Sequence, residues 1–204
     1  MELIIFCLII IFVLIVYCYY ICYDNDIYII SDIDNNNYLI RNGKNKSKRF
    51  LKESANILAR INININKMIN HLCDNYIDDQ NYNYFIRKLR DNYNYSILSE
   101  ASVDNRYTTY TINKESMHVC LRTRDQLEEL YDMNLLMYVL LHENSHLCNY
   151  TRNGIPIEGH GSEFKMIFKF LIQEAIKIGV YTYEDYTSNP REYCGIKINT
   201  NIMN

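Results

Sequence analysis

Apolar residues recur at steps of three and four along the segment that begins near Lys48, which predicts an amphipathic helix. The repeat alternates with asparagines between residues 61 and 65, so a strand would also fit that short part. The helical spacing continues for longer, and the helix is favoured. The apolar positions are Leu51, Ala55, Leu58, Ile61, Ile65, Met68, Ile69 and Leu72.

Shorter patterns predict a second helix and a hairpin. Residues 84–93 suit a short helix. Residues 107–112 and 117–123 alternate and are rich in β-branched and aromatic side chains, which predicts two strands joined across residues 113–116. His118 lies on the second strand, and we expect it to be structural.

Two apolar runs near the C-terminus predict a pair of buried helices. The first is MNLLMYVLLHENSHLCNY, for which Asp132 is a good N-cap. Ser162 suits the N-cap of the second, which ends at Gly179. Its apolar stripe consists of Phe164, Ile167, Phe168, Leu171, Ile172, Ala175 and Ile176.

The N-terminal region differs from the rest of the chain. Residues 3–22 contain no charged side chain, and a run of that length predicts a transmembrane helix. A cleaved signal peptide fits less well because there is no basic start and no small-residue cleavage site. Tyr17, Tyr19, Tyr20 and Tyr23 suit an interfacial belt, and the Asp- and Asn-rich residues 24–47 predict a polar tether.

Charge and cysteines add little to this picture. The basic residues of 41–52 follow the apolar run, which weakly favours a cytoplasmic domain. The formal net charge of −3 argues against a broad phosphate-binding surface. With 204 residues, one domain of ordinary size is expected beside the anchor.

The cysteines outside the apolar run leave two possibilities open. They could be free thiols or form two disulfides, and they are Cys73, Cys120, Cys148 and Cys194.

The candidate chemistry is concentrated in the first C-terminal helix. His142 and His146 are four residues apart, so both rings project from one helix face and can share a metal ion. Glu143 lies beside them, in the H-E-x-x-H arrangement of zinc peptidases. His160, between two glycines, is the favoured third ligand, ahead of Glu158 and Glu163. A pair of satisfied core histidines is the alternative.

The motifs HENSH and EGHGSEF resemble the SprT-like zinc metallopeptidases. The segments YTINKESMHVCLRTRD and EDYTSNPREYCGIKI also resemble uncharacterised predicted metallopeptidases of large DNA viruses, so the likeness covers roughly residues 105–200. It implies that His142, His146 and His160 bind one Zn²⁺ and that Glu143 is the general base. The loop to His160 is shorter than in SprT-like enzymes, and a hydrophobic N-terminus is not part of the soluble DNA-repair members.

Together these observations predict an α+β, zincin-like domain over residues 48–204, with a ligand helix, a small antiparallel sheet and flanking helices. A tether (24–47) would join it to a membrane anchor (1–23). The expected function is a zinc endopeptidase acting on a protein or peptide, and the strand 117–123 would offer its edge to the substrate. Tyr193 or Arg191 could stabilise the oxyanion, although packing is the favoured role of Tyr193.

Two other functions compete with this one. A membrane-anchored scaffold with a structural zinc is the first, but closed zinc sites usually contain cysteines. A DNA–protein crosslink protease would need a nucleic-acid-binding region, and none is evident in the sequence.

Overall fold

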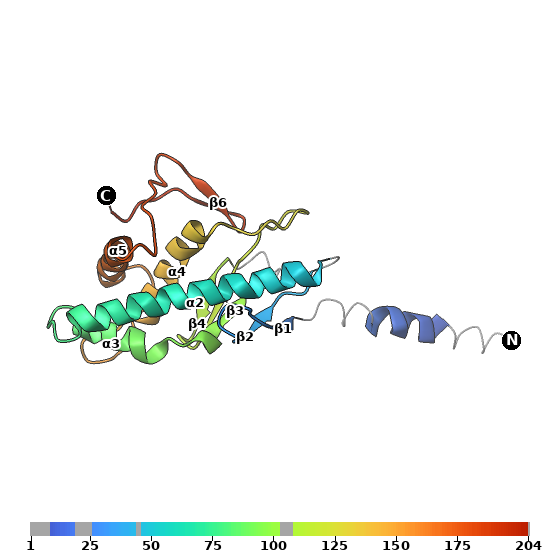
Figure 1. Cartoon of the computed structure of the whole chain (residues 1–204), viewed down its shortest axis with the longest axis horizontal. Coiled ribbons are helices and arrows are strands. Elements are labelled where there is room, and N and C mark those ends of the chain that lie inside the picture. The colour runs from blue at the N-terminus through green and yellow to red at the C-terminus, as the bar shows by residue number, and fades with distance from the viewer. Residues whose placement is uncertain (1–8, 19–25, 44–45, 103–107, 204) are drawn as a thin grey trace.

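The computed structural model describes residues 9–18, 26–43, 46–102 and 108–203. Its described part is an α+β fold in which helices pack against a mixed sheet (Figure 1). The five strands of that sheet lie in the order β1-β2-β3-β5-β4. They are β1 (Ile27–Ile30), β2 (Asn37–Ile40), β3 (Leu98–Glu100), β4 (Tyr110–Ile112) and β5 (Ser116–Val119).

The sheet is mixed, so the prediction of an antiparallel sheet is wrong. β1–β2 and β4–β5 are antiparallel hairpins, whereas β3 runs parallel to both β2 and β5. Parallel neighbours need a long connection, and α2 and α3 supply it between β2 and β3. The hairpin β4–β5 was predicted, and its turn places Asn113 and Lys114 at φ 50° and 59°, the geometry that matches strand twist.

The long helix α2 (Lys48–Tyr76) runs along the sheet and contacts β1, β2 and β3 (Figure 1). The helical interpretation is confirmed, because Ile61 and Ile65 are fully buried whereas Ile63 is 46% exposed. Ser47 caps its start by accepting a hydrogen bond from the Phe50 N–H. The short helix α3 (Asn83–Asn92) also agrees with the prediction.

Helices α4 (Met133–Leu147) and α5 (Ser162–Lys177) pack against each other. Asp132 is the N-cap of α4, as predicted, and it accepts a hydrogen bond from the Leu135 N–H. The predicted cap of α5 is wrong by one residue, since Gly161 holds the N-cap position without a side-chain hydrogen bond. A small hairpin of β6 (Arg191–Tyr193) and β7 (Ile196–Ile198) follows α5.

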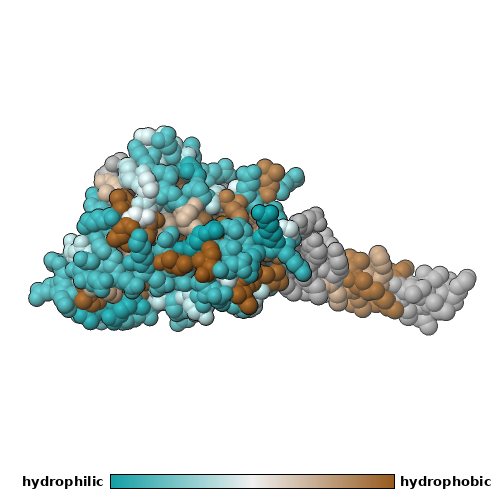
Figure 2. All heavy atoms as spheres, in the orientation of Figure 1, coloured by the Kyte–Doolittle hydropathy of each residue, from teal (hydrophilic) through white to brown (hydrophobic). Residues whose placement is uncertain are grey.

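The predicted transmembrane anchor and membrane location are wrong. Among the described residues no helix combines the length and the apolar character needed to cross a bilayer. The described helical segment of the predicted span covers residues 9–18 and is apolar (Figure 2). The rest of that span, and Tyr19, Tyr20 and Tyr23, lie outside the described residues.

The prediction of a polar tether over residues 24–47 is also wrong. Its described residues include β1 and β2, and both strands belong to the main sheet. Tyr38 and Ile40 on β2 are 1% and 0% exposed. This hairpin therefore belongs to the folded domain.

A disulfide and a buried ion pair follow directly from the end of β5. Cys120, directly after β5, forms a disulfide with Cys194, in the turn of the C-terminal hairpin. Cys73 and Cys148 are free thiols, so the alternative of two bridges does not hold. Arg122 is fully buried and donates to both carboxylate oxygens of Glu100, at 2.5 and 2.8 Å.

Candidate metal centre

Three histidine rings converge at one point between α4 and the start of α5. His142 and His146 lie one turn apart on α4, and His160 approaches them from the loop that precedes α5. The Nε2 atom of His160 is 3.1 Å from that of His142 and 3.0 Å from that of His146. In the described part of the chain this is the group that could hold a metal ion.

The geometry fits zinc. Imidazole nitrogens bound tetrahedrally at ~2.0–2.1 Å from zinc lie about 3.3 Å apart, close to the separations found here. A neutral imidazole has one donor and one acceptor nitrogen, so three Nε2 atoms facing one another cannot all be satisfied by mutual hydrogen bonds. A cation at their centre would satisfy all three lone pairs. The donor set therefore suits one Zn²⁺.

The first turn of α5 holds the three rings in place. The Phe164 ring centroid lies 4.9, 4.4 and 4.7 Å from those of His142, His146 and His160. Burial and the neighbouring histidines lower the pKa of His142 to about 3. Burial, His160 and Lys114 lower that of His146 to about 4. Both rings are thus neutral at physiological pH, the form that binds a metal.

Glu143 lies beside the cluster but is not one of its members. Its side chain comes from the same helix, and the residue is only 6% exposed. Burial raises the pKa of Glu143 to about 7, against the opposing effect of a hydrogen bond from Thr111. Thr111 Oγ1 donates that bond to Oε2 over 2.8 Å. A carboxylate with a pKa near 7 is suited to exchange protons at neutral pH.

Glu143, His142 and His160 line two adjoining cavities. The larger, about 880 Å³, follows residues 108–114 and so runs along β4. The smaller, about 600 Å³, lies between α4, α5 and the C-terminal segment. A reacting group beside the histidines would therefore be accessible from the edge of the sheet.

The strand expected to bind substrate was misassigned. β5 lies between β3 and β4, so its two edges are already paired. β4 is one of the two terminal strands of the described sheet, and it lies along the larger cavity. The error arises because a hairpin pattern predicts two strands without showing which one pairs with the rest of the sheet.

The two candidates for oxyanion stabilisation, Arg191 and Tyr193, each form hydrogen bonds with other residues. Arg191 donates to Asp132 at 2.5 Å and to Glu184 at 3.4 Å, so its guanidinium is bound at the N-terminus of α4. Tyr193 is 1% exposed and lines the smaller cavity. Its hydroxyl donates to the Cys120 carbonyl at 2.9 Å. Because that proton is already engaged, the packing role favoured for Tyr193 suits its contacts.

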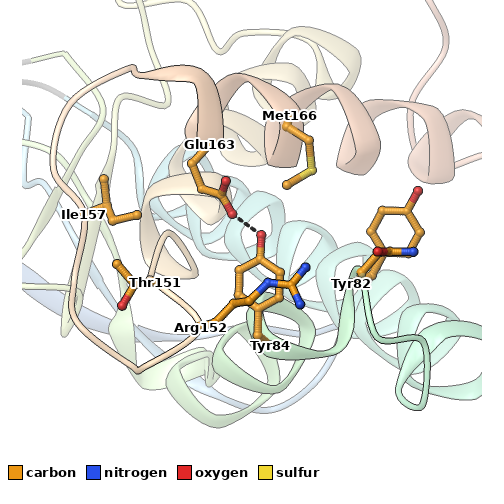
Figure 3. Close-up of a pocket in the computed structure, with 8 residues that line it drawn as sticks. Tyr82, Tyr84, Thr151, Arg152, Ile157, Glu163 and Met166 are labelled. Carbon is orange, nitrogen blue, oxygen red and sulfur yellow. Dashed lines mark hydrogen bonds between the residues drawn. The ribbon is translucent and has the colours of Figure 1, made fainter.

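The remaining candidates are not members of the three-histidine group. Glu163 accepts a hydrogen bond from the Tyr84 hydroxyl of α3, in a separate pocket (Figure 3). Glu158 lines the larger cavity but does not belong to the three-histidine group. His118 pairs with Ser99 Oγ at 2.8 Å, and Cys148 is buried with its thiol donating to the Asn144 carbonyl.

Sequence reasoning missed two residues that support this centre. Thr111 orients Glu143, and Lys114 donates to the carbonyl oxygens of His146 and Asn149 at the end of α4. A cation there complements the helix dipole and holds the backbone of His146 in place. Both residues lie in the segment YTINKESMHVCLRTRD, but their contacts with α4 follow only from the position of the hairpin beside that helix.

Comparison with known proteins identifies viral relatives. The chain is 34% identical over 177 residues to the Uncharacterized protein R325 of Acanthamoeba polyphaga mimivirus, covering 86% of this chain and 84% of that protein. It belongs to the same family as that protein. No protein-family model matches the chain, and no solved structure matches it.

Two further relatives match about half of their own length. Uncharacterized protein 136R of Invertebrate iridescent virus 6 is 32% identical over 90 residues, covering 43% of this chain and 47% of that protein. Uncharacterized protein 042R of Invertebrate iridescent virus 3 is 35% identical over 88 residues, covering 42% and 50%. The names of these relatives state no activity, so a function must be argued from the site.

Proposed function

We propose that this protein is a zinc-dependent endopeptidase. The observation that carries the proposal is the convergence of three histidines, with the His160 Nε2 atom 3.1 and 3.0 Å from those of His142 and His146, beside a buried glutamate outside that group. Three nitrogen ligands leave the fourth position of a tetrahedral zinc for water or substrate, as catalytic zinc sites do. His160 is an exposed residue, so that position is accessible to a substrate.

When bound, zinc supplies a Lewis acid that lowers the pKa of water and polarises a carbonyl. Glu143 accepts the proton from the attacking water and delivers it to the leaving amine. Thr111 keeps the Glu143 carboxylate oriented toward the cavity through its hydrogen bond to Oε2. The side chains of α5, chiefly Phe164, keep the three rings from rotating away.

The substrate is a peptide bound in an extended conformation. β4 ends the described sheet beside the larger cavity, and a strand edge binds a peptide backbone with little regard to sequence. Thr111 lies on that strand and contacts Glu143, so a peptide paired with β4 would pass close to the base. This arrangement suits cleavage within a chain.

Glu143→Gln tests the function, since the variant keeps the shape of the side chain but removes the base. Zinc content and melting temperature should barely change, whereas hydrolysis of an unfolded protein mixture should fall by ~10²–10⁴. Glu158→Gln is the matched control, because Glu158 lines the same cavity outside the cluster. If zinc-loaded wild-type protein cleaves nothing, and Glu143→Gln alters only stability, a structural zinc is the better assignment.

A further inference from the structure

The smaller cavity beside the histidine cluster has the walls of a side-chain pocket. Tyr138 and Val139 of α4 and Phe164 and Phe168 of α5 form one part of its lining. Tyr138, Phe164 and Phe168 are 9%, 3% and 4% exposed, so they belong to the core and hold a fixed shape. We name this cavity of about 600 Å³ the apolar pocket.

The C-terminal segment, residues 196–202, completes the pocket. Ile196, Ile198 and Ile202 contribute apolar lining. The segment is tied to the helices, because Tyr138 Oη donates to the Thr200 carbonyl at 3.4 Å and Lys169 Nζ to the Met203 carbonyl at 3.2 Å. The Cys120–Cys194 disulfide fixes its start. The apolar pocket is therefore formed before any substrate arrives.

Apart from Glu143, the charged side chains that line the pocket are cations. Lys165 and Lys197 line it and are exposed. Within the described residues, neither ammonium group has a hydrogen bond or an ion pair with another side chain. Glu143 is the acidic residue of the lining, and it is engaged by Thr111. A carboxylate at this rim would find two cations without a nearer partner.

We propose that the apolar pocket binds the substrate residue next to the scissile bond and selects a large apolar side chain accompanied by a carboxylate. The inference rests on the proposed function, since it gives that site its substrate class. The pocket shares His142, Glu143 and His160 with the cluster, so a side chain inside it lies beside the bond to be cleaved. The carboxylate can be an acidic side chain or the C-terminus of the substrate.

Binding of short fluorescein-labelled peptides to zinc-loaded Glu143→Gln protein, measured by anisotropy, tests this without requiring catalysis. One set of peptides carries Leu, Phe or Ala at one position. A second set has Asp or Asn at the next position and a free or amidated C-terminus. Leu and Phe should bind at least about tenfold more tightly than Ala, given the free energy of burying such side chains. The Asp/Asn and acid/amide pairs distinguish the two carboxylate sources.

Three variants then assign the preferences to the pocket. Val139→Phe narrows it and should reduce the preference for Phe over Ala by about tenfold. Lys165→Glu and Lys197→Glu should abolish the preference for a carboxylate, whereas Lys48→Glu, an equal charge change at an exposed position of α2, should preserve it. Measuring kcat/KM of wild type with the same peptides links binding to cleavage.

The outcomes separate the pocket from the enzyme. Selective binding without any cleavage would support the pocket and count against the peptidase. Cleavage with equal binding of Leu, Phe and Ala peptides would overturn the pocket and leave the peptidase intact. Apolar selectivity that Val139→Phe does not alter would place the side chain elsewhere. A carboxylate preference that survives both lysine reversals would overturn the role of the rim.

Discussion

Thr111 Oγ1 on β4 donates a 2.8 Å hydrogen bond to Oε2 of Glu143 on α4. This bond joins a terminal strand of the described sheet to the helix that carries two of the three clustered histidines. The strand that we propose to bind the substrate backbone and the proposed base are thus directly connected. A shift of β4 would move the carboxylate as well.

Replacing Thr111 tests this connection. Thr111→Val keeps the shape of the side chain but removes the donor, so peptide hydrolysis should fall about ten- to hundredfold, as for a slightly misplaced catalytic group. Thr111→Ser should retain most of the activity because it keeps the hydroxyl. Zinc content should match wild type in both. Equal rates for Thr111→Val and wild type would show that Glu143 needs no such orientation.

The metal ligands can be assigned by zinc content. Purified full-length protein should carry about one zinc per chain, and His160→Ala should lose most of it, since two ligands bind zinc weakly. Glu158→Ala is the control and should stay loaded, and Glu163→Ala should keep most of its zinc because it removes only the contact with Tyr84. Atomic absorption after dialysis measures all four proteins. Loss of zinc in a glutamate variant but not in His160→Ala would identify a different third ligand.

The contact between α3 and α5 should influence the metal centre from outside it. Tyr84 donates to Glu163, whose neighbour Phe164 packs on all three histidines (Figure 3). Tyr84→Phe removes this bond, and we expect zinc affinity to fall by about tenfold, the lower end of effects from groups outside the ligand set. Tyr82→Phe, in the same pocket, is the control. Competition with a chromophoric chelator gives both affinities.

The disulfide should contribute strongly to stability. Cys120 and Cys194 are 74 positions apart, and in the chain-entropy model a loop of that size is worth on the order of 4 kcal/mol. The Cys120→Ser/Cys194→Ser protein should therefore unfold at much lower urea concentration, and Cys73→Ser should not. Alkylation of the native protein before reduction should label neither Cys120 nor Cys194. Labelling of both would contradict the bridge.

The buried Arg122–Glu100 pair allows a test of how much an ion pair inside the sheet contributes to stability. Burial raises the pKa of Glu100, against the opposing effect of Arg122. Arg122→Met removes both hydrogen bonds from the Arg122 guanidinium and leaves the buried carboxylate with Arg41, whose Nε is 4.0 Å away, so stability should fall by ~3–5 kcal/mol. The pKa of Glu100 should then rise further above 4.5, and the stability of the variant should decrease as pH increases from 4.5 through the folded-state value. Urea titrations between pH 4 and 8 measure this, and Arg122→Met/Glu100→Leu should lose the pH dependence.

The sequence by itself determined the features that depend on local spacing. The apolar steps of three and four in residues 51–72 predicted α2, because a helix buries one side of its own sequence. The spacing of His142 and His146 placed both rings on one face of α4, and Asp132 marked the start of that helix. Each of these features is decided within a few residues along the chain.

Only the tertiary structure decided which distant segments meet. β1 and β2 were hidden in a polar stretch because each is four residues long and pairs with partners that composition does not reveal. The edge position of β4, the hydrogen bond from Thr111 to Glu143 and the engagement of Arg191 by Asp132 are also contacts between segments far apart in the chain. Strand order and side-chain partners follow from packing the whole domain, since one hydrophobic pattern is compatible with several pairings.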